Sequence, residues 1–154
     1  MSVGDICDSC DVFYIGGTKC GALCGEALVF TQGNMPEHFH TMLKQRGAIL
    51  AKTRVMSQQF DALFTDGLYL EIGRRGTELA LELREAFLEK GYAPYIDSPT
   101  NQQFFVLDRA TVERLTKDVA FTLWQQLDGD RAAVRFVTSW ATSPEAVAQL
   151  KALR

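Results

Sequence analysis

Residues 13–30, FYIGGTKCGALCGEALVF, contain two short apolar runs joined by a glycine-rich connection that carries one lysine, Lys19. Residues 12–15 and 26–30 are rich in β-branched and aromatic side chains, so the stretch predicts two strands joined by a turn. A lysine held between glycines presents its amine in a fixed direction beside an open backbone, which suits an aldehyde cofactor. From these residues alone, a solvated surface lysine is the commoner interpretation.

Two long helices are predicted after this hairpin. Pro36 stands just inside the expected first turn, and apolar residues recur at helical spacing up to Leu63, so we expect one continuous helix from about residue 36 to 64. The stretch 65–91 repeats the pattern through Leu79, Leu83 and Phe87 and predicts a second helix that stops at Gly91.

The remaining sixty or so residues predict a small α/β unit. Short apolar runs predict strands within 92–96, 103–107, 119–124 and 133–140. Helical patterns cover 108–118 and 143–154, and Ser143 is the expected N-cap of the last helix, followed by Pro144. The chain is therefore expected to be of the α/β class. Because a two-stranded piece needs a larger sheet, we expect this to be the later part of a longer fold.

Composition narrows the possible functions. The 154 residues carry a net charge of −3, so no basic surface for nucleic acid is expected. No apolar run reaches the length of a membrane span, and the N-terminus is acidic, unlike a signal peptide. We therefore expect a cytoplasmic protein that binds neither nucleic acid nor membrane.

Five stretches in combination resemble one family of enzymes: DVFYIGGTKCGALCGEALVF, LKQRGAILAKTR, DGLYLEI, TNQQFFVL and VRFVTSWAT. They resemble the threonine aldolase and β-eliminating lyase family, which depends on pyridoxal 5'-phosphate (PLP) and has the fold type I, or aspartate aminotransferase, architecture. The resemblance covers essentially the whole chain and implies the C-terminal portion of proteins roughly twice as long. It implies a strand hairpin, two long helices and a small C-terminal α/β domain.

The resemblance implies roles for five residues. Lys19 matches the catalytic lysine that binds PLP covalently, and Thr18 lies beside it in the cofactor site. Arg135 matches the arginine that grips the substrate α-carboxylate, a task that suits a planar guanidinium. Lys44 falls where the family places a basic residue that reaches the PLP phosphate across a dimer interface, and Arg46 is its neighbour. Without the resemblance, we would interpret Arg135 as a surface charge at the edge of a strand. Lys44 and Arg46 would be interpreted as part of a solvated helix face.

The resemblance also implies an organisation and an activity. Residues 1–64 would be a remnant of the PLP-binding large domain, and residues 65–154 a connecting helix and the small domain. The implied reaction cleaves a β-hydroxy amino acid such as threonine or allo-threonine to glycine and an aldehyde. The implied assembly is a homo-oligomer, a dimer or tetramer, or a complex with a separate N-terminal half.

Two alternatives stay open. The chain could be a truncated or split lyase that is inactive alone, because the family's remaining cofactor ligands lie in the N-terminal half and none can be assigned here. It could also catalyse another PLP-dependent reaction, a β-elimination or an aminotransferase-like step. Many threonine aldolases have histidine after the VT that follows the arginine, where this chain has Ser139.

The cysteines and histidines are weaker candidates. Four thiolates could bind Zn²⁺, but their spacing does not form two tight knuckles, so we expect no metal site and interpret them as buried or half-buried thiols: Cys7, Cys10, Cys20 and Cys24. His38 and His40 do not share a helix face and are expected at the surface. Asn101 is expected to stabilise a turn by bonding its local backbone.

Overall fold

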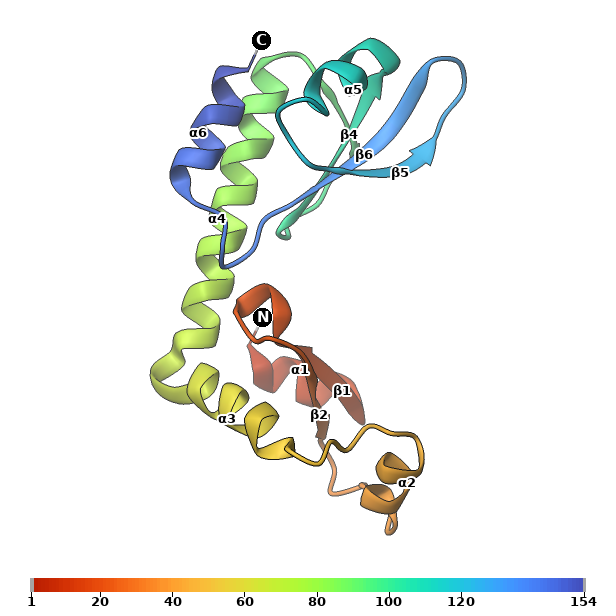
Figure 1. Cartoon of the computed structure of the whole chain (residues 1–154), viewed down its shortest axis with the longest axis vertical. Helices are drawn as coiled ribbons and strands as arrows, with labels where there is room; N and C mark the ends of the chain where they lie inside the picture. The colour runs from red at the N-terminus through yellow and green to blue at the C-terminus, as the bar shows by residue number, and fades with distance from the viewer. Residues whose placement is uncertain (1, 154) are drawn as a thin grey trace. The chain divides into compact units, whose positions relative to one another are not determined.

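The structure, a computed structural model, describes residues 2–153 (Figure 1). They divide into two compact units, the first ending at Tyr69 and the second beginning at Leu70. Across the described residues, no helix is both long enough and apolar enough to cross a membrane.

The first unit contains the predicted hairpin. Strands β1 (Val12–Gly16) and β2 (Glu26–Phe30) pair antiparallel, and the 3-10 turn η1 (Thr18–Cys20) lies in their connection. This confirms the two strands expected from the opening stretch. A short helix before them, α1 (Val3–Ser9), was not expected; Ser2 and Asp5 form a capping box at its start, a signal that the sequence does carry.

The prediction of one continuous helix over residues 36–64 is wrong. The segment instead forms α2 (Phe39–Gln45) and α3 (Thr53–Phe64). Gly47 adopts a left-handed φ of +70°. Its N–H donates to the Lys44 carbonyl at 3.1 Å, and the next N–H donates to the Leu43 carbonyl at 2.9 Å. These two bonds are the Schellman arrangement that ends a helix, so the glycine outweighs the apolar periodicity.

The second predicted helix is confirmed. After the short turn η2 (Thr65–Gly67), α4 runs over Leu68–Glu89. Gly91 has a φ of +83° and donates to the Leu88 carbonyl at 2.9 Å, while Tyr92 donates to the Phe87 carbonyl at 3.0 Å. The helix therefore ends at the glycine that the sequence marks.

The second unit is built on a four-stranded antiparallel sheet in the order β3-β4-β6-β5. Its elements agree with the predicted ones within a few residues: β3 (Ala93–Ile96), β4 (Gln102–Asp108), α5 (Arg109–Leu115), β5 (Thr122–Gln126), β6 (Arg131–Val137) and α6 (Pro144–Ala152). Ser143 caps α6 as expected, accepting from the Ala146 N–H at 3.1 Å. Asp108 caps α5 in the same way, and the Thr111 N–H holds the pKa of its carboxyl below the usual value.

One face of this sheet carries the core. Phe105 and Val134 are fully buried and face each other across β4 and β6. The ring centroid of Phe87, from α4, lies 4.7 Å from the ring centroid of Phe105 and 4.9 Å from that of Phe136. Helix α6 runs alongside α4 in Figure 1 and completes the cluster with Val147 and Leu150. Because side chains alternate along a strand, Arg135 lies on the opposite face.

Candidate active site

Lys19 lies at the middle of η1, in the turn between β1 and β2. Its side chain is exposed, and within residues 2–153 it makes no hydrogen bond or ion pair. The backbone of the turn is closed by the Gly17 carbonyl, which accepts from the Cys20 N–H at 2.9 Å and from the Ala22 N–H at 3.0 Å. The Lys19 amine therefore has no partner within residues 2–153, while hydrogen bonds fix the backbone of its turn.

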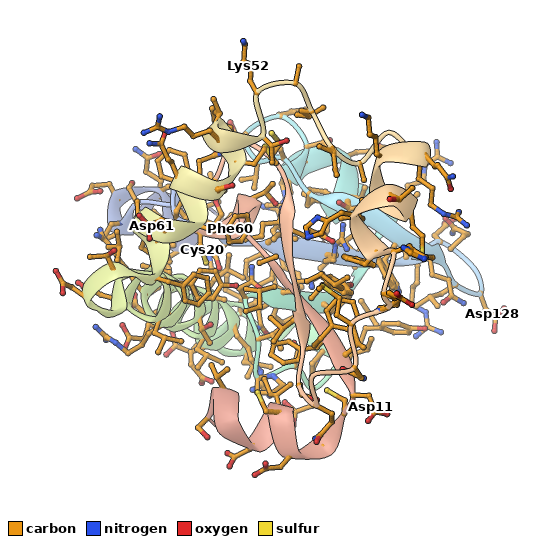
Figure 2. The ribbon with its side chains drawn as sticks, turned by 90° about the horizontal axis from the view of Figure 1, so that it is seen from below. Asp11, Cys20, Lys52, Phe60, Asp61 and Asp128 are labelled. Atoms are coloured by element: carbon orange, nitrogen blue, oxygen red, sulfur yellow. The ribbon has the colours of Figure 1, made fainter. Side chains whose placement is uncertain are left out.

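Helix α3 and Tyr69 hold this turn from outside. The Gln59 side chain accepts from the Leu23 N–H at 2.6 Å, and the Tyr69 hydroxyl donates to the Gly16 carbonyl at 2.9 Å. A Cβ added at Gly17 would lie 3.0 Å from the Phe60 ring, so that ring packs directly on the backbone beside Lys19. Figure 2 labels Phe60 on α3 and Cys20 on η1.

The thiol next to Lys19 is a packing group. Cys20 is buried, and burial raises the pKa of its thiol, although the hydrogen bond with Tyr69 acts in the opposite direction. The pKa of Tyr69 is also raised, first by burial and then by the Cys20 thiolate charge and hydrogen bond. Both groups therefore stay uncharged at neutral pH, and neither is activated as a nucleophile.

The first unit also contains a hollow of about 690 Å³, whose lining includes Cys24, Gly25, Leu50, Met56 and Phe60. Its lining is mostly apolar and includes no lysine or arginine. A phosphate needs cationic or N–H donors, so this hollow does not have the chemistry of a phosphate site.

The other expected cofactor residues are at the surface. Thr18 is exposed at the start of η1. Lys44 lies in the last turn of α2, and Arg46 is the C-cap of that helix. Both side chains are exposed, and across the described chain no hydrogen bond or ion pair joins either of them to Lys19. They offer free cations, which fits the chemistry of a phosphate ligand.

Arg135 belongs to the second unit, in the middle of β6. It is half-buried, and its Nη1 donates to the Gln102 Oε1 at 3.1 Å. Its Cζ lies 5.1 Å from the ring centroid of Trp124. The Arg135 Nε is buried and has no hydrogen-bond partner within residues 2–153. The guanidinium is therefore held on two sides while its hydrogen bonding within the chain is incomplete.

An irregularity in β5 sets up this arrangement. Leu123 pairs with Val134 and Gln125 pairs with Ala133, so Trp124 is an extra residue in the strand. Such a bulge re-aims side chains, and here the indole reaches the Arg135 face. The Phe104 ring packs edge-on against Trp124 at 5.2 Å.

Gln102 and Trp124 were not predicted as site residues, because their contact with Arg135 depends on strand pairing and on the bulge. The prediction for Asn101 is also wrong: its side chain donates to the Thr138 carbonyl at 2.7 Å, far along the chain. Thr138 in turn is buried and donates to the Gly76 carbonyl at 2.6 Å, so Asn101 helps to tie the end of β6 to α4.

The cysteines and histidines form no second site in the described part of the chain. All four cysteines are free; Cys7 and Cys10 are half-buried, Cys20 is buried, and Cys24 is exposed, contrary to the expectation for that residue. No group of three or more His, Cys, Asp or Glu side chains within residues 2–153 could hold a metal ion. His38 and His40 are exposed, as predicted.

The chain is similar to known proteins in sequence and in structure. No family model matches the chain. It is 27% identical over 143 residues to a low-specificity L-threonine aldolase of Pseudomonas sp. (strain NCIMB 10558), and 28% identical over 141 residues to that of Pseudomonas aeruginosa. These matches cover 92% and 91% of this chain but 40% of each relative. The solved structure of Leishmania major threonine aldolase matches with a TM-score of 0.93 and 30% identity, over 98% of this chain and 44% of that one.

The chain resembles threonine aldolases. The matched region of the Leishmania threonine aldolase is its C-terminal part, which confirms the expected α/β fold class and the expected C-terminal portion. The chain spans about two fifths of the length of the threonine aldolases that it matches.

Proposed function

We propose that this chain carries the lysine and the arginine of a PLP-dependent lyase that cleaves a β-hydroxy amino acid to glycine and an aldehyde. The main support for the proposal is the structural match to the Leishmania major threonine aldolase, which has a TM-score of 0.93 over 98% of this chain. The names of the Pseudomonas relatives support the same reaction.

Lys19 would hold the cofactor. An amine that is exposed, unpaired and fixed on a tied turn can attack an aldehyde without first leaving another partner. Thr18 would lie beside the cofactor, and Lys44 and Arg46 would supply positive charge for its phosphate. When bound, PLP supplies an electron sink for the bond that breaks at the substrate α-carbon.

Arg135 would bind the substrate α-carboxylate. Its guanidinium carries a fixed charge, and within residues 2–153 no acidic side chain pairs with it. A carboxylate gripped in this way is oriented, which sets which bond of the α-carbon is aligned for cleavage.

The proposed enzyme acts together with the part of a threonine aldolase that this chain does not match, in one polypeptide or as a separate chain, and as a homo-oligomer. The length of the relatives supports this, because the matched region is 40% of each.

The test is cleavage of L-threonine and L-allo-threonine by the purified chain together with PLP and the part of a threonine aldolase that the chain does not match, measured as acetaldehyde and glycine. We expect turnover that Lys19→Ala abolishes. Arg135→Lys is expected to raise KM at least tenfold, because a bidentate fork becomes a point charge. Release of 2-oxobutyrate and ammonia without glycine would indicate β-elimination, a different PLP reaction.

A further inference from the structure

We infer that Gln102 and Trp124 are positioning residues that pre-order the Arg135 guanidinium for a carboxylate. The inference rests on the proposed function, because it assumes that Arg135 binds the substrate carboxylate. Neither residue needs to touch the substrate for this role.

The two contacts restrict different motions. The Gln102 Oε1 accepts a hydrogen bond from the Arg135 Nη1 at 3.1 Å. The Trp124 ring packs against the cation, with 5.1 Å between Cζ and the ring centroid. Gln102 comes from β4 and Trp124 from β5, the two strands that flank β6 in the sheet. The arginine is therefore restrained from both sides before any ligand arrives.

Both restraining side chains are neutral, and this matters for binding. An aspartate or glutamate in place of Gln102 would order the guanidinium equally well but would also neutralise its charge. Gln102 and Trp124 order the group and leave its charge for an incoming anion. Arginine has a large rotamer entropy, so ordering it in advance removes a cost that substrate binding would otherwise meet.

The aromatic restraint is itself supported. Trp124 is 48% exposed, so an isolated indole there would be free to change rotamer. The Phe104 ring, which is 9% exposed, packs edge-on against it at 5.2 Å. Phe104 is also the cross-strand partner of Arg135. The bulge in β5 therefore places the Trp124 indole against the Arg135 guanidinium, and the Phe104 ring packs against that indole.

The experiment observes Arg135 directly by NMR of the ¹⁵N-labelled full chain, with its Nε–H signal assigned by its loss in Arg135→Lys. The variants are Gln102→Leu and Trp124→Leu. The matched control is Trp140→Leu, since Trp140 is 60% exposed and does not contact Arg135. Glycine with PLP is the carboxylate probe, and methylamine is the probe without a carboxylate.

We expect both variants to lower the order parameter of the Arg135 Nε–H and to weaken glycine binding about fivefold, a loss typical of one cation–π contact or hydrogen bond. The control should change neither. In the turnover assay, KM should rise while kcat stays close to the original value, because the lost interaction serves binding.

Gln102→Glu separates positioning from simple structural support. It keeps the acceptor, so Arg135 should remain ordered, yet glycine should bind more weakly than to Gln102→Leu because the two charges pair. If Gln102 had a purely structural role, Gln102→Glu would not combine an ordered Arg135 with weakened glycine binding.

Two results would overturn the inference in different ways. If Arg135 is as ordered in both leucine variants as in the original chain, the positioning role is rejected and the proposed function stands. If Arg135 is ordered by both residues but glycine and methylamine shift its signal equally, the carboxylate role is rejected, and the positioning role falls with it.

Discussion

At the residue scale, the turn that carries Lys19 depends on how tightly its backbone is packed. Gly17 has ordinary right-handed dihedral angles, so its conformation alone does not require glycine. The requirement is steric: a Cβ there would lie 2.6 Å from the Ala22 Cβ and 3.0 Å from the Phe60 ring. The neighbouring Gly16 has nothing within 4 Å of an added Cβ.

Gly17→Ala is therefore expected to destabilise the first unit by roughly 1–3 kcal/mol through overpacking. Gly16→Ala, one residue away on exposed strand, should change the free energy of unfolding by less than about 0.5 kcal/mol. Urea unfolding followed by tyrosine fluorescence compares the two variants. Equal effects of the two substitutions would contradict the close packing of α3 on the turn.

The sequence predicts single residues well where their role is local. The strands that flank Lys19 and the cap at Ser143 depend on nearby residues, and both are confirmed. Gln102 and Trp124 could not be predicted, because each meets Arg135 only after three strands have paired and β5 has bulged. Pairing register across strands is not written in a local pattern.

At the element scale, the break between α2 and α3 shows which of two local signals is stronger. Apolar residues continue at helical spacing across residues 46–52, which favours one helix. Gly47 opposes them with a left-handed φ of +70° and the paired bonds that close α2. Gly73, inside α4, is a glycine with no such role.

The two glycines are expected to respond to alanine with opposite signs. Gly47→Ala should destabilise the chain by roughly 1 kcal/mol, because a Cβ is strained at positive φ. Gly73→Ala should stabilise it by about 0.5–1 kcal/mol, because helical φ suits alanine and nothing lies within 4 Å of the added Cβ. Chemical denaturation measures both. A stabilised Gly47→Ala variant, with increased helical circular dichroism, would instead support the continuous helix.

At the scale of the whole molecule, the chain divides at Tyr69 and Leu70, and the proposed functional residues are divided with it. Lys19, Thr18, Lys44 and Arg46 belong to the first unit, whereas Arg135 belongs to the second. The assignment of residues 1–64 and 65–154 to a large-domain remnant and a small domain stays a prediction. The core of the second unit combines aliphatic side chains with the rings of Phe87, Phe105 and Phe136.

Phe105→Ala tests whether this core acts as a unit. The side chain is fully buried between Phe87 and Phe136, so its removal should cost about 3–5 kcal/mol. Hydrogen exchange followed by mass spectrometry should show lost protection in β4, β6, α4 and α6. Protection of β1 and β2 should be unchanged, and equal losses in both units would show that they unfold as one.

The fold class and most elements of the second unit could be predicted because its strands and helices alternate in short, clearly bounded runs. The resemblance to threonine aldolases came from stretches that span both units, and the comparisons confirm it. The sequence patterns could not give the contacts that complete a site, such as those of Gln102 and Trp124 with Arg135. They depend on tertiary packing.

The most direct test of the account is an absorbance spectrum of the purified protein with PLP, before and after borohydride, beside Lys19→Ala. Lys52→Ala is the matched control, because Lys52 is also exposed in the first unit and projects from the loop before α3 (Figure 2). We expect a visible absorbance band that reduction converts to a covalent adduct on Lys19. The band should be kept in Lys52→Ala and lost in Lys19→Ala. A spectrum identical in all three proteins would contradict the assignment of Lys19 as the cofactor lysine.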